Sequence, residues 1–396
     1  MSRVHVLHVL NSAHGGSALS TFELIKDLDQ KGIQSSLVCF DNAGAEQKKK
    51  ISAIVHGRVI FIPLYWLNKK IRSAWWKRPV IEALSLWKTW GGYRYQASIS
   101  SFIQKHGINV VHTSTILNPE GAIASRKNNI PHIWHVRELV GPDKHFHFYN
   151  YPRWANFVSN HCEWLVANSS VTEKCLLQFF SPDKIVCIPN GIAVQNFRVR
   201  NHSNNKEKII VGMVGSMTTR WKNHALFIKT AAQFLERPHA VEFRIYGAIP
   251  ADTDPYYIDI KELVKSTGTE NIVRFVSFKS PEEIMEEIDI MFHPSEFESF
   301  GRIFVEAMAA GIPVIGLDEG GALEMIRHGV NGFLLPKEDM AAIKEHICRL
   351  IESEALRTDF GKKGRQLAEE KYSLDQLSNE MASLYKRVVN QDAGDL

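Results

Sequence analysis

The stretch HPSEFESFGRIFVEAMAAGIPVI, residues His293–Ile315, contains most of one parallel α/β unit. The apolar residues that lead into it predict a strand over Asp289–Pro294. The polar residues Ser295–Phe300 predict a loop, and Gly301–Ala310 predicts a helix. The run IPVIGLD then predicts the next strand. Short apolar strands that alternate with helices are typical of a parallel sheet covered by helices on both faces.

The same alternation extends through the rest of the chain. In the first half we expect strands at Val4–Leu10, Ser36–Phe40, Val59–Pro63, Val110–His112, His132–Val136, Trp164–Ala167 and Ile185–Ile188, with helices that include Ser17–Asp29 and Tyr93–His106. The second half begins again at Ile209 with IIVGMVG, VEFRIYG and IVRFVSF. The fold class is therefore α/β, with two doubly wound, Rossmann-like domains.

A polar segment without hydrophobic periodicity, RVRNHSNNKEK, separates the two halves. With 396 residues the chain is too long for one ordinary core. We expect an N-terminal domain over 1–197, a linker over 198–208 and a C-terminal domain over 209–396. Charged helices from Lys337 to Val389 are expected on the surface of the second domain, with the last helix able to pack back on the first. A central cleft between the domains is the default ligand site.

Composition excludes several classes of protein. A net charge of +4 argues against a dedicated nucleic-acid binder. The five cysteines are scattered and form no CxxC pair, which argues against a disulfide framework and a zinc site. No apolar run approaches the roughly 20 residues that span a bilayer, and the N-terminus predicts a strand rather than a signal peptide.

Two glutamates in the opening stretch are candidates for ligand binding. Glu298 lies in the predicted loop at the carboxyl end of a strand, and Glu306 lies in the following helix. The neighbours of Glu306 are apolar, so its carboxylate would be costly to bury without a partner. A carboxylate accepts two hydrogen bonds from vicinal hydroxyls, and a helix N-terminus attracts phosphate. The pair therefore suits a nucleotide sugar, although a surface glutamate on an amphipathic helix is the plainer alternative for Glu306.

These motifs resemble the retaining GT-B glycosyltransferases of family GT4, also called glycosyl transferases group 1. The resemblance rests on E-S-F-G-R-I-F-V-E and A-M-A-A-G-I-P-V-I, on GGALEMI and HGVNGFL further on, and on IPNGI near the end of the first half. It implies a donor site in which Glu306 holds the ribose and Glu298 positions the sugar, together with Ser299, Phe300 and Gly301. It also implies that no cofactor or metal is required.

Two basic residues and two glycines extend the expected donor site. Arg220 and Lys222 follow the first strand of the second domain and would neutralise a diphosphate. The resembled family usually has Gly-Arg where Gly215 and Ser216 stand, so Arg220 would replace that arginine. Gly15 and Gly16 open a helix after the first strand, and the resemblance places them near the donor phosphates and the acceptor. The glycines alone are equally typical of an ordinary loop.

Three residues at strand ends in the first domain are further candidates. His135 ends the strand IWHV, and the resemblance implies that it contacts the donor sugar. Glu138 and His112 are weaker candidates for the acceptor side, and Glu138 could equally pair with Arg137. The alternative for the histidines is a structural role, because the chain has 17 of them.

The motif DTD at Asp252–Asp254 invites a metal interpretation. Asp254 precedes Pro255, however, and this order is typical of a helix N-cap followed by proline at the first helical position. We therefore expect a cap rather than a metal site.

The stretch Tyr65–Gln96 has an unusual composition. It carries seven Lys or Arg residues against one acidic residue, and five of the nine tryptophans of the chain. Tryptophan with lysine suits an anionic membrane surface. A mobile insertion that lines the acceptor site, or a partner surface, fits as well, and the alternatives stay open here.

Together these features predict a metal-independent, retaining hexosyltransferase. It would move a sugar from a nucleotide diphosphate sugar to a glycan, lipid-linked or small-molecule acceptor in polysaccharide or glycolipid synthesis. We expect it in the cytoplasm or peripherally on the inner face of the membrane, without nucleic-acid partners. A nucleotide-sugar epimerase and a non-catalytic nucleotide-sugar-binding protein on the same fold are the alternatives.

Overall fold

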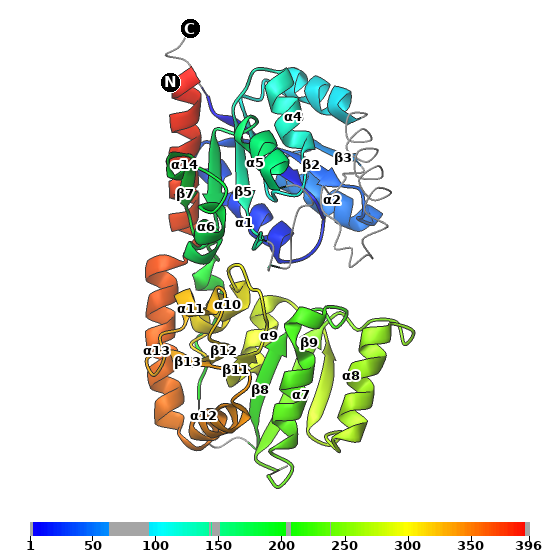
Figure 1. Ribbon diagram of the computed structural model, residues 1–396, viewed down its shortest axis with the longest axis vertical. Helices are drawn as coiled ribbons and strands as arrows, with labels where there is room; N and C mark the ends of the chain where they lie inside the picture. The colour runs from blue at the N-terminus through cyan, green and yellow to red at the C-terminus, as the bar shows by residue number, and fades with distance from the viewer. Residues whose placement is uncertain are drawn as a thin grey trace. The chain divides into compact units, whose positions relative to one another are not determined.

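The computed structural model describes residues 3–62, 95–141, 144, 151–202, 207–237 and 239–392. The chain divides into two compact units, one of Met1–Gly191 with Leu374–Leu396 and the other of Ile192–Ser373 (Figure 1). Each unit contains one fully parallel sheet, so the expected pair of doubly wound α/β sheets is confirmed.

The first unit has a seven-stranded sheet in the order β3-β2-β1-β4-β5-β6-β7. Its strands are β1 (His5–Leu10), β2 (Gln34–Phe40), β3 (Val59–Ile62), β4 (Val110–Thr113), β5 (His132–Val136), β6 (Trp164–Ala167) and β7 (Ile185–Cys187). Its helices are α1 (Gly16–Gln30), α2 (Ala45–Ile54), a helix over 95–106, α4 (Glu120–Lys127), α5 (Tyr151–Ser159), α6 (Ser170–Leu176), the short η2 (Pro182–Lys184) and α14 (Leu374–Asp392). The strand order reverses between β1 and β4, and open α/β sheets bind ligands at such a switch point.

The second unit has a six-stranded sheet in the order β10-β9-β8-β11-β12-β13. Its strands are β8 (Ile209–Val214), β9 (Val241–Gly247), β10 (Val273–Ser277), β11 (Ile290–His293), β12 (Val314–Leu317) and β13 (Gly332–Leu335). Its helices are α7 (His224–Ala232), α8 (Pro255–Ser266), α9 (Pro281–Glu287), α10 (Arg302–Ala309), α11 (Ala322–Met325), α12 (Met340–Glu352) and α13 (Glu354–Lys371), with short turns η3 (Val194–Asn196) and η4 (Arg220–Lys222). The switch point lies between β8 and β11.

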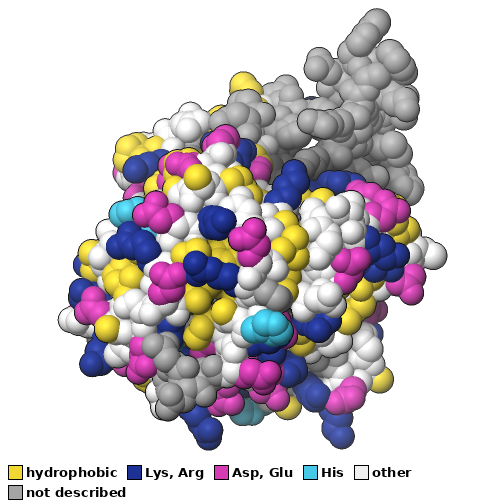
Figure 2. All heavy atoms as spheres, turned by 90° about the horizontal axis from the view of Figure 1, so that it is seen from below, with side chains coloured by type: hydrophobic (Ala, Val, Ile, Leu, Met, Phe, Trp, Pro, Cys, Tyr) yellow, Lys and Arg dark blue, Asp and Glu magenta, His cyan; other side chains and the backbone are white. Residues whose placement is uncertain are grey.

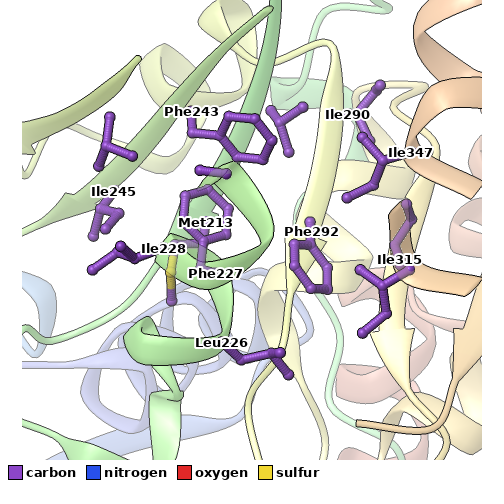
Figure 3. Packing of buried hydrophobic residues seen from close by; sticks show 14 of the residues in the cluster. Met213, Leu226, Phe227, Ile228, Phe243, Ile245, Ile290, Phe292, Ile315 and Ile347 are labelled. Carbon is purple, nitrogen blue, oxygen red and sulfur yellow. The ribbon is translucent and has the colours of Figure 1, made fainter. Parts of the chain in front are cut away.

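Aromatic packing fixes the centre of the second sheet. Phe227 from α7 stacks on Phe292 from β11 at 5.8 Å between ring centroids, and it meets Phe243 from β9 edge to face at 5.4 Å (Figure 3). All three side chains are fully buried. This packing holds α7 against β9 and β11, the two strands that flank β8 in the sheet, and so fixes the position from which the loop after β11 starts.

The observed division of the chain differs from the expected linker. Phe197 is buried in an apolar cluster of the second unit, and the backbone N–H of Arg200 donates to the Ala310 carbonyl at 2.8 Å. The Arg200 side chain also binds the buried carboxylate of Asp289 at 3.2 Å. Residues 192–202 therefore belong to the second unit, because these contacts hold them to its sheet and helices.

The helices of Lys337–Val389 divide between the two units, and the last helix belongs to the first, as the sequence analysis allowed. Helices α12 and α13 do belong to that unit, whereas α14 belongs to the first. Leu377, Met381 and Tyr385 of α14 are buried in the apolar cluster formed by β1, β4 and β5. Strand β13 was not predicted; it has four residues and begins with a glycine.

Acidic and basic side chains are intermingled on the face that Figure 2 shows. This distribution agrees with the small net charge of +4. Among the helices that the structure describes, none combines the length and the apolar character needed to cross a bilayer.

Candidate active site

The loop after β11 is joined to the loop after β8 at the switch point of the second sheet. The backbone N–H of Glu296 donates to the Trp221 carbonyl at 2.8 Å, and the Ser295 hydroxyl oxygen lies 3.3 Å from the same carbonyl oxygen. The Asn223 amide donates to the Glu296 carboxylate at 3.3 Å. Asn223 has a left-handed backbone and caps α7 by accepting from the Leu226 N–H. The two loops therefore form one connected structure.

Two glycines support the far side of the same loop. The backbone N–H of Gly321 donates to the Glu298 carbonyl at 2.8 Å. A Cβ atom on Gly320 would lie 2.6 Å from that carbonyl oxygen, and one on Gly321 would overlap the Phe300 carbonyl. Neither backbone group can move without displacing the loop. The GGALEMI motif is therefore required for close packing of the loop that carries Glu298.

We predict that Gly321→Ala destabilises the protein by about 2 kcal/mol and weakens nucleotide binding at least tenfold, because the new methyl group displaces residues 298–300. Gly44→Ala is the matched control: Gly44 precedes α2 in the same way, and a Cβ there meets no atom within 4 Å. Thermal unfolding and isothermal titration with nucleotide measure the two effects. Equal behaviour of both variants would contradict the packing role.

Glu298 lies at the centre of a polar cluster. Its Oε1 atom accepts from the Lys222 ammonium, from the Ser295 hydroxyl at 2.9 Å, and lies 3.4 Å from Nε2 of His293. The side chain of Glu298 is 19% exposed, so the carboxylate is partly open to a ligand. The predicted Glu298 and Lys222 are thus brought into direct contact, although they are far apart in sequence.

Opposing effects set the protonation of Glu298. Burial by itself raises the pKa of its carboxyl group, whereas the Lys222 ammonium and the contact with His293 lower it. The charge effect prevails and holds the pKa well below its ordinary value. Glu298 is therefore an anion at neutral pH and can accept hydrogen bonds from hydroxyl groups.

Glu306 is buried in α10, as its apolar neighbours predicted. It is 5% exposed, and the Arg302 guanidinium donates to its carboxylate at 2.7 Å from the preceding helical turn. Gly301 adopts a left-handed backbone immediately before the helix, where φ is 85°. Arg302 was not among the predicted residues, and its contact orients the Glu306 carboxylate.

The remaining predicted donor residues have different surroundings. Arg220 binds Asp259 of α8 at 2.7 Å and lies over the ring of Tyr256 at 4.7 Å, with its side chain 68% exposed. Phe300 is buried in an apolar cluster, so its backbone rather than its ring faces Gly321. Ser299 lies between Glu298 and Phe300 in the same loop.

Asp254 is a helix cap, as expected. Its carboxylate accepts from the backbone N–H groups of Tyr256 and Tyr257 at 3.0 and 2.9 Å, and Pro255 begins α8. Asp252 instead pairs with Lys261 at 2.7 Å. In the described part of the chain no cluster of histidine, cysteine, aspartate and glutamate side chains is arranged to hold a metal ion.

In the first unit, Gly15 and Gly16 lie at the start of α1. Gly15 has a φ of 88°, which a residue with a side chain rarely adopts, and no atom of the described part of the chain lies within 4 Å of the Cβ position of either glycine. The backbone at this helix N-terminus is thus open, as a site for phosphate or a hydroxyl group requires.

His135 and His112 both lie in the core of the first sheet. Each ring is fully buried, and the two rings stack at 5.4 Å between centroids. Within the described residues, neither ring nitrogen of His135 has a hydrogen-bond partner. A buried polar group without a partner is rare in folded proteins, and contact of His135 with a donor sugar stays a prediction.

Glu138 is held by the loop after β4. Its carboxylate accepts from the Thr115 hydroxyl at 2.5 Å and from the backbone N–H groups of Ile116 and Arg137 at 3.3 and 3.1 Å. Burial raises the pKa of Glu138 above its ordinary value. These contacts describe a residue that braces two loops, and a role at the acceptor side stays a prediction.

Three residues near these sites were not predicted. His293 and Ser295 contact Glu298, and their positions at a strand end were the signal available in the sequence. Asn118 is fully buried after β4, and neither polar atom of its side chain has a hydrogen-bond partner in the part of the chain that the structure describes. No motif distinguishes Asn118, so only the structure identifies it.

Comparison with known proteins agrees with this geometry. The second half matches the model of the family "Glycosyl transferases group 1" over residues 194–367. The first half matches the model of "Glycosyltransferase Family 4" over residues 14–196. The chain belongs to glycosyltransferase family 4. The predicted family is therefore confirmed.

Two curated relatives illustrate the range of this family. The chain is 26% identical to the capsular polysaccharide biosynthesis glycosyltransferase CapM of Staphylococcus aureus over 212 residues, which are 52% of this chain and 55% of CapM. It is 31% identical to the N-acetyl-alpha-D-glucosaminyl L-malate synthase of Bacillus anthracis over 139 residues, 35% of this chain and 36% of the synthase. The chain thus spans about half or less of the length of these two relatives.

Solved structures match over nearly the whole chain. Alr3699/HepE of Anabaena, in complex with UDP and glucose, superimposes with a TM-score of 0.77 at 21% identity. The superposition covers 96% of this chain and 99% of the HepE chain. TarM of Staphylococcus aureus gives a TM-score of 0.72 at 16% identity, with 97% of this chain and 100% of TarM covered. These likenesses show that the glycosyltransferase family 4 chain has the GT-B fold.

Proposed function

We propose that the protein is a retaining, metal-independent glycosyltransferase that moves a hexose-type sugar from a nucleotide diphosphate sugar to a glycan, lipid-linked or small-molecule acceptor. The observation that carries the proposal is the contact between Lys222 and the ionised Glu298 at the switch point of the second sheet. A cation beside an anion at this place suits a ligand that has both phosphates and hydroxyl groups.

Each residue of the site has a role in this proposal. Glu306, oriented by Arg302, accepts hydrogen bonds from the ribose hydroxyls. Lys222 and Arg220 stabilise the charge that develops on the departing diphosphate. Glu298 and the backbone of Ser299–Gly301 hold the donor sugar.

The first unit supplies the second group of residues. His135 contacts the donor sugar, Gly15 and Gly16 leave room for the phosphates, and Glu138 and His112 lie on the acceptor side. The family resemblance implies retention at the anomeric carbon. We propose that the acceptor oxygen attacks on the face that the diphosphate leaves, and that a phosphate oxygen of the leaving group takes the acceptor proton.

The biological setting follows from the relatives. CapM is named for capsular polysaccharide biosynthesis, and another relative from Staphylococcus aureus is named poly(ribitol-phosphate) alpha-N-acetylglucosaminyltransferase. We therefore propose a role in cell-surface polysaccharide or glycolipid synthesis. Because HepE and TarM were crystallised with UDP, a UDP-sugar is the first donor to test.

A thermal-shift screen with UDP-, GDP- and ADP-sugars tests the donor proposal. We expect one nucleotide class to raise the melting temperature, since a ligand that binds only the folded state stabilises it. Addition of candidate acceptors then tests transfer. Absence of stabilisation by all three classes would contradict the proposal, and conversion of the donor without an acceptor would favour an epimerase.

We also propose a cytoplasmic location with peripheral membrane contact through the basic, tryptophan-rich stretch Tyr65–Gln96, of which residues 65–94 lie outside the described residues. Its net charge is +6, from seven basic residues and one acidic residue. Anionic liposomes are expected to bind the wild type more strongly than a variant in which Trp75, Trp76, Lys77 and Arg78 are replaced by alanine. Co-sedimentation with the liposomes measures the binding. Equal sedimentation would reject the contact.

A further inference from the structure

Three buried imidazole rings lie next to one another on adjacent strands of the first sheet. His8 of β1 is 5.2 Å from His112 of β4, and His112 is 5.4 Å from His135 of β5, between ring centroids. The rings of His112 and His135 are nearly parallel, with 17° between their planes. All three residues are fully buried.

The orientation of His135 depends on this stacking. Because neither of its ring nitrogens has a hydrogen-bond partner among the residues that the structure describes, no hydrogen bond from these residues fixes the rotation of the ring. The flat face of the His112 ring packs against the His135 ring and is one of the surfaces that restrict its rotation. A neutral imidazole has one donor and one acceptor nitrogen, and their directions depend on that rotation.

His112 is in turn fixed by the last helix of the chain. Its Nδ1 atom lies 2.5 Å from the hydroxyl of Tyr385 in α14, and the Tyr385 side chain is fully buried. Tyr385 also meets the edge of the His8 ring, at 6.4 Å between centroids. A buried hydrogen bond of this length allows little rotation of the His112 ring.

The groups in this cluster are electrically neutral at physiological pH. Burial, with the charge of Arg137 as a further cause, lowers the pKa of His112 and His135 well below the ordinary value. Burial raises the pKa of Tyr385 well above its ordinary value. The hydrogen bond between Tyr385 and His112 thus joins two uncharged groups.

We propose that Tyr385 and His112 are positioning residues for His135: the Tyr385 hydroxyl fixes the His112 ring, which holds the stacked His135 ring in the orientation that meets the donor sugar. This inference rests on the proposed function, in which His135 contacts that sugar. It assigns to α14 a task in the reaction besides covering the sheet. A side chain that is misplaced by a fraction of an ångström loses much of its contribution to a transition state.

The test replaces Tyr385 by phenylalanine, which keeps the ring and removes only the hydroxyl. Ser378→Ala is the matched control, because Ser378 lies in the same helix and its hydroxyl donates to Asp27 of α1 rather than to a histidine. Both variants lose one hydrogen bond between α14 and the rest of the first unit. We expect similar small decreases of their melting temperatures.

Two measurements separate positioning from general stability. In protein labelled with ¹³C at histidine Cε1, with His112→Gln and His135→Gln variants for assignment, Tyr385→Phe is expected to shift the His135 resonance and Ser378→Ala is not. With the donor from the thermal-shift screen, Tyr385→Phe should lower kcat about tenfold with an unchanged donor KM, and Ser378→Ala should stay within about twofold of wild type.

Either of two results overturns the inference: a His135 resonance that moves no more in Tyr385→Phe than in Ser378→Ala, or an equal loss of kcat in both variants. The spectroscopic comparison needs no turnover. If the wild type consumes no nucleotide sugar, that result counts against the proposed function, whereas the resonances still decide whether Tyr385 orients His135.

Discussion

Replacement of Glu298 by glutamine is expected to lower kcat by about 10² to 10³ while the protein stays folded. Glutamine has nearly the same shape, so the loop and its contacts with the Trp221 carbonyl persist. The change removes the negative charge beside Lys222 and turns one acceptor oxygen into a donor amide. A sugar hydroxyl that donates to Glu298 would then meet the wrong partner, and Lys222 would lose the charge that orients it.

Steady-state kinetics with the donor, together with thermal unfolding, measure the effect of Glu298→Gln. Glu338→Gln is the control, because Glu338 is an exposed glutamate outside the loops described above. We expect the control to retain wild-type kcat. A Glu298→Gln variant with wild-type turnover would remove Glu298 from the mechanism, and a variant that unfolds would show that its charge serves the fold instead.

The sequence predicts the sheets well, because each buried strand is a short apolar run. Strands β5, β6 and β9 have the predicted bounds, and the other predicted strands shift by a few residues at their ends. The domain boundary is less predictable. Polar residues around Arg200 have the composition of a linker, and only the tertiary contacts of Phe197 and Arg200 show that this segment belongs to the second unit.

The candidate site is predictable where a motif carries it. The spacing of Glu298 and Glu306 placed one carboxylate in the loop and the other in a buried helix, as observed. Contacts between distant segments could not be predicted in the same way. The pairing of His112 with Tyr385 joins residues 273 positions apart, and it requires α14 to return to the first unit.

Replacement of Lys222 by methionine is expected to lower kcat/KM by about 10² to 10³, since the proposed diphosphate loses its nearest cation. The same replacement should also reverse the direction in which the pKa of Glu298 is shifted. In the wild type, burial raises the pKa of Glu298 but Lys222 and His293 lower it further, to below its ordinary value of 4.5. His293 is itself fully buried and its pKa is lowered, so it is neutral and cannot replace the lost charge. Burial then prevails, and the pKa of Glu298 rises.

The contribution of Glu298 to stability should therefore change with pH in opposite directions in the wild type and in Lys222→Met. With a lowered folded pKa, the ionised Glu298 stabilises the wild type above the ordinary pKa, and this contribution is lost only as the pH falls through the lowered value. With a raised folded pKa, the variant is stabilised by the protonated form, and it loses that contribution as the pH rises through the raised value. The free energy of unfolding of the wild type should thus exceed that of Lys222→Met by roughly 2 kcal/mol more at neutral pH than near pH 4. Urea unfolding at both pH values measures the difference, with Lys229→Met on the exposed face of α7 as the control. A difference between wild type and Lys222→Met that does not change with pH would show that Lys222 does not govern the ionisation of Glu298.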